Sequence, residues 1–127
     1  MTPFEMLREF HEKFGAAINQ PFTEDLRQLR TNLITEEYYE TDFELNTAYD
    51  RLGRPIDKKK LTKELADLVY VTIGTAVTFG LPLEEVFAEV HRSNMSKLGD
   101  DGKPITRADG KILKSPNYKE PQLDHLF

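Results

Sequence analysis

The sequence contains no cysteine, so disulfides, thiolate metal sites and cysteine nucleophiles are excluded. Histidine is also scarce, with three in 127 residues, which leaves few imidazole ligands for zinc. A chain without disulfides suits a reducing compartment, and we expect a cytoplasmic protein.

Long hydrophobic runs are missing as well. The longest apolar-rich stretch, residues 65–79, is shorter than a membrane span, and it is interrupted by Asp67, Thr72, Gly74, Thr75 and Thr78. The first residues carry neither a basic segment nor an apolar run, so we expect no signal peptide. We therefore expect no membrane partner.

An excess of basic residues is absent, since the net charge is −5 and the pI is near 5.2. A general nucleic-acid binder would carry a basic footprint, so we expect no nucleic acid polymer as partner. Hydrophobic residues make up 39% of the chain, which is enough for one compact core. We expect a single domain over residues 1–127, with a helical core at about 3–98 and a loop-rich tail at 99–127.

Helical periodicity and helix-end signals predict an all-α fold, a four-helix bundle. Thr2 and Glu5 form a capping pattern at the first start, Asp57 can cap the third helix, and Gly80 is suited to end it. A loop at 51–56 separates the second helix from the third. The third helix is apolar on almost every side, as a central buried helix would be. The predicted helices span residues 3–18, 23–49, 57–79 and 82–94.

After Gly99 the chain changes character. Two Asp-Gly pairs, at 101–102 and 109–110, flank a short extended run and signal turns. We expect a small hairpin or ordered loop in this tail, and the segment 121–127 can form a helical turn.

Two acidic pairs stand out in the helical part. Glu37 and Glu40 form an ExxE motif, and after 23 intervening residues Glu64 and Asp67 form an ExxD motif. Residues three apart on a helix share one face and can direct their side chains at one point. One such pair on each of two facing helices would supply four oxygen ligands.

Both pairs are expected to point inward. Glu37 lies about 20° from Leu26 around the helix axis and Glu40 lies about 20° from Leu29, so they extend an apolar stripe. Four ionised carboxylates facing an apolar interior are costly unless cations neutralise them. Oxygen ligands favour Mg²⁺ or Mn²⁺ over zinc. The alternative is a pair of solvated helix faces, where acidic residues at this spacing are common.

Charge is unevenly distributed along the chain. Residues 24–50 hold eight acidic residues and two arginines, a net of −6, whereas residues 97–119 hold six basic residues and three acidic ones, a net of +3. A polyphosphate substrate would suit both segments, because cations can bridge its oxygens to the carboxylates while Lys and Arg neutralise the rest. Ordinary solubility is the alternative explanation for the basic tail.

Several motifs together resemble the MazG-like all-alpha NTP pyrophosphohydrolases, especially the short single-domain, phage-type and dUTPase-like members. Besides the two acidic motifs, the likeness rests on Ser93-Asn94-Met95-Ser96-Lys97, Phe10-His11-x-x-Phe14-Gly15 and Asp109-Gly110-Lys111-x-x-Lys114-x-Pro116-Asn117-Tyr118. It covers nearly the whole chain. It implies a metal-dependent attack of water on the α-phosphorus of a nucleoside triphosphate, which releases the monophosphate and pyrophosphate.

The resemblance also implies roles for individual residues. Glu36 matches a carboxylate that orients or deprotonates the water, and a role on the helix surface is the alternative. Asn94 should face inward beside Phe87, and a capped core asparagine is the competing interpretation. His11 could approach a nucleobase or be simply packed. The matching Mg²⁺ ligands are Glu37, Glu40, Glu64 and Asp67, and the matching substrate contacts are Asn94, Lys97, Lys114, Tyr118 and His11.

The almost wholly apolar third helix cannot be hidden by four helices alone, and helices of the family pair across subunits. We therefore expect a homodimer or homotetramer. Deoxyuridine or deoxycytidine nucleotides are the leading substrates from the resemblance. Two other functions stay open: a phosphoribosyl-ATP pyrophosphohydrolase, against which the loop-rich tail argues, and a non-catalytic helical module that binds a nucleotide or a protein.

Overall fold

The computed structural model describes residues 1–46, 53 and 55–127. Within them the chain forms four α-helices, followed by a short antiparallel hairpin and a 3₁₀ turn. The predicted all-α fold with a small C-terminal hairpin is confirmed. None of the described helices is both long and apolar enough to cross a bilayer. The helices are α1 (Pro3–Phe14), α2 (Glu24–Asn46), α3 (Lys58–Phe79) and α4 (Leu83–Met95).

Most helix ends follow the predicted signals. The Thr2 hydroxyl accepts a hydrogen bond from the Glu5 amide, and the Glu5 carboxylate accepts one from the Thr2 amide, which completes a capping box. The Asp57 carboxylate accepts two amides in the first turn of α3. Gly80 ends α3 with a φ of 66°, a left-handed conformation that favours glycine.

The first helix is shorter than predicted. It ends at Phe14 rather than residue 18, because Gly15 adopts a φ of 69° and its amide donates back to the His11 carbonyl. The second helix begins after Thr23, whose hydroxyl accepts the Leu26 amide. Residues 47–49 of the predicted second helix, and residues 51, 52 and 54 of the predicted loop, lie outside the described residues.

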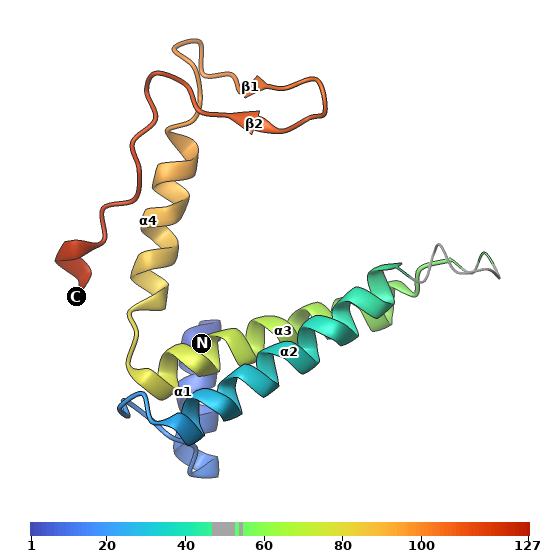
Figure 1. Cartoon of the computed structure of the whole chain (residues 1–127), viewed down its shortest axis with the longest axis vertical. Coiled ribbons are helices and arrows are strands. Elements are labelled where there is room, and N and C mark those ends of the chain that lie inside the picture. The colour runs from blue at the N-terminus through green and yellow to red at the C-terminus, as the bar shows by residue number, and fades with distance from the viewer. Residues whose placement is uncertain (47–52, 54) are drawn as a thin grey trace. The chain divides into compact units, whose positions relative to one another are not determined.

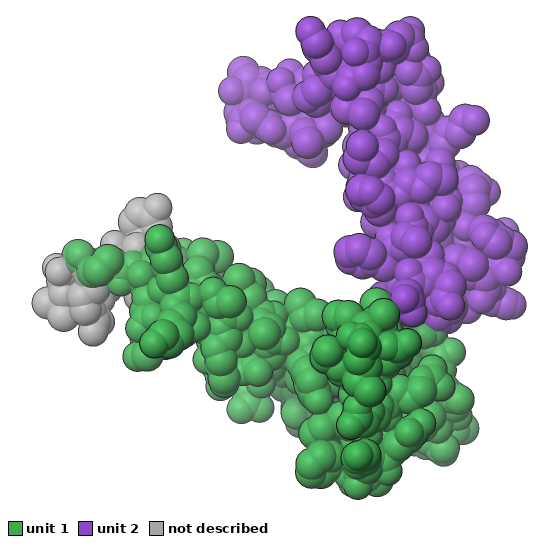
Figure 2. Space-filling model, turned by 180° about the vertical axis from the view of Figure 1, so that it is seen from behind, with its two compact units in different colours: residues 1–81 green, residues 82–127 purple. Residues whose placement is uncertain are grey.

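The chain divides into two compact units, residues 1–81 and residues 82–127, which are coloured separately in Figure 2. In the first unit, α2 and α3 lie side by side and α1 packs against α3 (Figure 1). Leu7, Ile73 and Ala76 are its buried apolar residues. The single domain over residues 1–127 stays a prediction.

The third helix is not buried on all sides, contrary to the prediction. Ile73 and Ala76 are buried, whereas Leu65 and Val69 are 46% and 53% exposed. The reason is that α1 and α2 cover only part of its circumference within the chain. The uncovered side lines an apolar groove of about 420 Å³ together with residues of α1 such as Met6.

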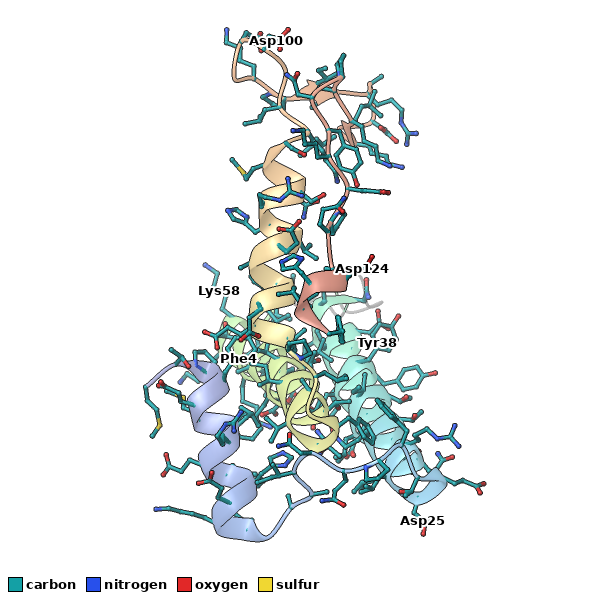
Figure 3. All side chains as sticks on the ribbon, turned by 90° about the vertical axis from the view of Figure 1, so that its left-hand side faces the viewer. Phe4, Asp25, Tyr38, Lys58, Asp100 and Asp124 are labelled. Atoms are coloured by element: carbon teal, nitrogen blue, oxygen red, sulfur yellow. The ribbon has the colours of Figure 1, made fainter. Side chains whose placement is uncertain are left out.

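In the second unit, the tail packs along α4. Strand β1 (Ile105–Thr106) pairs with β2 (Ile112–Leu113), and the predicted helical turn forms as η2 (Asp124–Leu126). Figure 3 shows the tail running beside α4 to Asp124. The Ser96 hydroxyl accepts the Lys119 amide at 2.9 Å, and the Glu89 carboxylate accepts the Gln122 amide at 2.9 Å.

Candidate metal centre

Four carboxylates meet where α2 faces α3. Each offers an oxygen, and these oxygens all lie within 4.8 Å of one another. The three-residue spacing puts each pair on one helix face, and the side-by-side packing of α2 and α3 makes the two faces oppose. The structure thus brings together all four residues predicted as ligands: Glu37, Glu40, Glu64 and Asp67.

Two of these side chains contain a buried oxygen without a partner. Glu37, Glu64 and Asp67 are half-buried and Glu40 is exposed. The Oε2 atoms of Glu37 and Glu64 are out of contact with solvent and accept no hydrogen bond within the described part of the chain. Leaving a buried charged acceptor unsatisfied is costly. Both oxygens are therefore placed to accept a positively charged ligand.

The electrostatics of the cluster are unfavourable without a cation. Burial raises the pKa of Glu37, and the neighbouring carboxylates of Glu40 and Asp67 raise it further. Burial also raises the pKa of Glu64, and hydrogen bonding to Glu40 adds to that effect. Like charges at such separations disfavour joint ionisation. A divalent ion between them would reverse this repulsion.

Lys63 lies at the cluster, although sequence reasoning did not select it. Its Nζ is 2.6 Å from Asp67 Oδ2 and 3.8 Å from Glu64 Oε1. The hydrogen bond to Asp67 raises the pKa of Lys63. Its four-residue spacing to Asp67 is a signal that could have identified the pair. One exposed ammonium group cannot neutralise four carboxylates.

A second unpredicted residue, Thr41, joins the two helices at the cluster. Its buried Oγ1 is 2.8 Å from the Glu37 carbonyl oxygen and 3.2 Å from the Glu64 carbonyl oxygen. The hydroxyl proton is therefore shared between the backbones of two candidate ligands on different helices. The pairing of α2 with α3 had to be known before this contact could be recognised.

The donor set fits a hard divalent cation. All four side chains present oxygen, which is the preferred ligand of Mg²⁺ and Mn²⁺, and no nitrogen or sulfur ligand competes among them. Two of these oxygens are buried without a partner in the described part of the chain, and burial and the neighbouring carboxylates raise the pKa values of Glu37 and Glu64. The cluster could hold such an ion.

The other predicted residues of the first unit, Glu36 and His11, do not belong to this group of four carboxylates. Glu36 is exposed on α2 beside Glu37. His11 is only 2% exposed, and its Nδ1 lies 2.9 Å from the Ala17 carbonyl oxygen. A carbonyl can only accept, so Nδ1 carries the proton and Nε2 is the acceptor in the neutral ring. His11 is therefore packed and bonded, and its role toward a nucleobase stays a prediction.

The other four predicted contacts belong to the second unit. The Lys97 amide donates to the Asn94 carbonyl at 3.1 Å, and the Lys114 ammonium lies 4.6 Å from the ring centre of Tyr118. The predicted inward direction of Asn94 is wrong within this chain. Asn94 is exposed and Ser93 is buried, because the tail packs on the face of α4 that carries Ser93 and Ser96.

Comparisons with known proteins identify the family. A comparison with curated proteins finds no match. A family model described as phosphoribosyl-ATP pyrophosphohydrolase matches residues 7–94, a segment that contains all four clustered carboxylates. The chain belongs to the phosphoribosyl-ATP pyrophosphohydrolase family, within the MazG-like all-alpha NTP pyrophosphohydrolase superfamily, whose members cleave a pyrophosphate from nucleotide-type substrates.

Proposed function

We propose that the protein is a metal-dependent pyrophosphohydrolase of nucleoside triphosphates. Water would attack the α-phosphorus, the bond between this phosphorus and the bridging oxygen would break, and pyrophosphate would leave with the bonding electrons. The products are a nucleoside monophosphate and pyrophosphate. The observation that carries the proposal is the convergence of four carboxylate oxygens within 4.8 Å in a chain of this family.

In this proposal the chain positions groups and takes up a proton. Glu37, Glu40, Glu64 and Asp67 would hold divalent ions, Mg²⁺ or Mn²⁺, between α2 and α3. Such ions polarise phosphoryl oxygens and lower the pKa of water when bound. Glu36 would accept the proton of the attacking water, since it is exposed and adjacent to a ligand residue.

The second unit would supply positive charge and contacts to the substrate. Lys97 and Lys114 would neutralise phosphate oxygens, while Asn94 and Tyr118 would contact the nucleoside, as the resemblance implies. The net charge of +3 over residues 97–119 supports a role toward an anionic substrate. Because Lys97, Lys114 and Tyr118 lie outside the matched residues 7–94, their assignments rest on the resemblance and on charge.

Phosphoribosyl-ATP is the second candidate substrate, because the description of the matching family names it. The loop-rich tail after Gly99 and the likeness to short, phage-type members favour a simple deoxynucleoside triphosphate, with deoxyuridine and deoxycytidine nucleotides first. Both substrates would use the same carboxylates, so the acidic cluster does not separate them.

A substrate panel with product identification tests the proposal. The purified protein with Mg²⁺ should convert at least one deoxynucleoside triphosphate into monophosphate and pyrophosphate. Turnover of phosphoribosyl-ATP far above every simple nucleotide would transfer the assignment to the second candidate. Release of orthophosphate, or nucleotide binding without hydrolysis in both Mg²⁺ and Mn²⁺, would refute the proposed reaction.

A homodimer or homotetramer in the cytoplasm stays part of the proposal. The apolar side chains left open on α3, and Phe87 on α4, which is 70% exposed, support a partner copy. Sedimentation equilibrium at micromolar concentration should give a mass of two or four chains. A monomer at that concentration would contradict it.

A further inference from the structure

Arg30 is a buried cation that the proposed chemistry does not use. It lies on α2, and 9% of the residue is exposed. Burial lowers the pKa of Arg30, and no carboxylate in the described part of the chain opposes that effect. A buried guanidinium without an acidic partner is costly, so a ligand that accepts hydrogen bonds would stabilise it.

Two hydrogen bonds hold the guanidinium in place. Nε donates to Thr75 Oγ1 at 3.0 Å, and Nη2 donates to the Val71 carbonyl at 2.8 Å. A guanidinium has five N–H donors in a fixed plane, so the remaining donors are oriented before any ligand arrives.

Gly74 makes room for this arrangement. A Cβ atom at Gly74 would lie 2.6 Å from Arg30 Nη2 and 3.2 Å from His11 Nε2. Both nitrogens therefore approach the backbone of α3 at one point, and any larger residue would displace them. This explains a glycine in the middle of a helix, where it otherwise costs stability.

Arg30 and His11 line a cavity of about 180 Å³. Leu7, Phe10, Leu33 and Tyr70 supply apolar walls, and the rings of Phe10 and Tyr70 meet edge to face at 5.6 Å. Pockets for whole ligands span roughly 300–1,000 Å³, so this cavity is sized for one part of a ligand. Apolar and aromatic walls suit a flat ring and not a phosphate group.

The cavity and the acidic cluster lie along the same seam between α2 and α3. Arg30 precedes Glu37 by seven residues, which is two helical turns, about 10 Å, on the same face. Tyr70 follows Asp67 by three residues on α3. One ligand with phosphates at the cluster could therefore place a ring in the cavity.

We infer that Arg30 is a specificity-determining residue that donates hydrogen bonds to a carbonyl-bearing base of the nucleotide, seated in the cavity between α1, α2 and α3. The inference rests on the proposed function. It predicts that uracil, cytosine or guanine nucleotides are preferred over adenine nucleotides, because adenine has no carbonyl oxygen and presents an amino donor to the guanidinium.

Calorimetry with dUMP, dCMP, dGMP and dAMP in Mg²⁺ tests the inference without relying on turnover. The natural protein should bind at least one carbonyl-bearing nucleotide more tightly than dAMP. Arg30→Met should weaken the binding of that nucleotide about tenfold or more and leave the affinity for dAMP unchanged, since hydrogen bonds to a charged group are the stronger kind. Arg27→Met, which removes an exposed arginine from the same helix, is the matched control and should change neither affinity.

Two further variants separate recognition of the base from structural support of the Arg30 side chain. Thr75→Val removes the partner of Nε and should lower the melting temperature while keeping the ranking of bases. Arg30→Lys keeps a charge and loses the planar fork, so it should lose the ranking even if it folds well. Equal weakening of all four nucleotides by Arg30→Met and Arg30→Lys, or no base preference in the natural protein, would overturn the inference.

The outcome also separates this inference from the proposed function. Base-selective binding that depends on Arg30, without any hydrolysis, would support the recognition role and refute the hydrolase. Hydrolysis that depends on Glu64 but is the same for every base and unaffected by Arg30→Met would support the hydrolase and refute the recognition role.

Discussion

The two units of the molecule treat glutamate in opposite ways. In the second unit, Glu89 accepts hydrogen bonds from the Arg92 guanidinium and from the Gln122 amide, and together they lower its pKa to about 2. In the first unit, Glu37 and Glu64 lie among other carboxylates, their pKa values are raised, and each keeps a buried oxygen without a partner.

The difference separates an acid whose charge the chain itself stabilises from acids that keep an unsatisfied oxygen. Glu89 obtains every donor it needs from the chain, so its charge fastens the tail to α4. Glu37 and Glu64 each keep a buried oxygen that no donor in the described part of the chain satisfies, so they are suited to bind a cation. The arrangement of donors around a carboxylate is therefore more informative than the presence of an acidic cluster.

Replacing a candidate ligand should have the largest effect. We expect Glu64→Gln to lower kcat/KM for the preferred nucleotide by at least about 100-fold, because even residues that only support metal ligands cost about 10–100-fold. In the metal-free protein the same change should raise the melting temperature, since it removes a charge from a repelling cluster. Steady-state kinetics checks the fall in kcat/KM, and thermal unfolding checks the rise in melting temperature.

The control for this variant is Glu85→Gln, which removes an exposed acid from α4. It should change neither activity nor melting temperature appreciably. If Glu64→Gln kept full activity, or lost activity together with metal-free stability, Glu64 would belong with Glu89 as a structural acid.

Adding metal should produce the next largest effect. A ligand that binds only the folded state stabilises it by about 2.7 kcal/mol at a concentration 100 times its dissociation constant. Mg²⁺ or Mn²⁺ should therefore raise the midpoint of urea unfolding. The shift should vanish in the Glu37→Gln, Glu64→Gln double variant and persist in Glu85→Gln. A shift that survives the double variant would place the ion elsewhere.

Removing the Thr41 hydroxyl, which joins α2 to α3 at the cluster, should have a smaller effect. Thr41→Val leaves the Glu37 and Glu64 carbonyl oxygens without their shared donor, and we expect a loss of about 1 kcal/mol in the free energy of unfolding. Thr72→Val is the matched control, because the Thr72 hydroxyl is exposed and donates to the Leu68 carbonyl of its own helix. Urea unfolding of both variants measures the difference. An equal loss in both would remove the special role of Thr41.

Much of the fold could be predicted from local signals. Thr2, Asp57 and Gly80 mark helix ends through contacts within one turn, and these predictions are confirmed. The end of the first helix at Gly15 was not predicted, because Ile18 continues the helical spacing of apolar residues beyond the glycine. The tail hairpin was predicted because each Asp-Gly turn is also a local signal.

The candidate site also contains residues that local signals predict and residues that they do not. The four carboxylates were found from their spacing, which is a property of each helix alone. Arg30, Thr41 and Gly74 were missed because their roles depend on contacts between residues far apart in sequence. Two signals were available: Arg30 lies on the apolar stripe seven residues before Glu37, and Gly74 interrupts an apolar helix without ending it.

The smallest predicted effect concerns the structural acid. The pKa of Glu89 is lowered to about 2 from an ordinary value of 4.5, so its stabilising contribution is present above about pH 4.5 and is lost as the pH falls toward 2. The tail should then loosen from α4. As the pH falls, Glu37 and Glu64 should be protonated before Glu89, because their pKa values are raised. The Gln122 amide signal in NMR spectra should follow the titration of Glu89. In Glu89→Gln that signal should stay unchanged over the same range, and a signal that still moves would assign the loosening to another group.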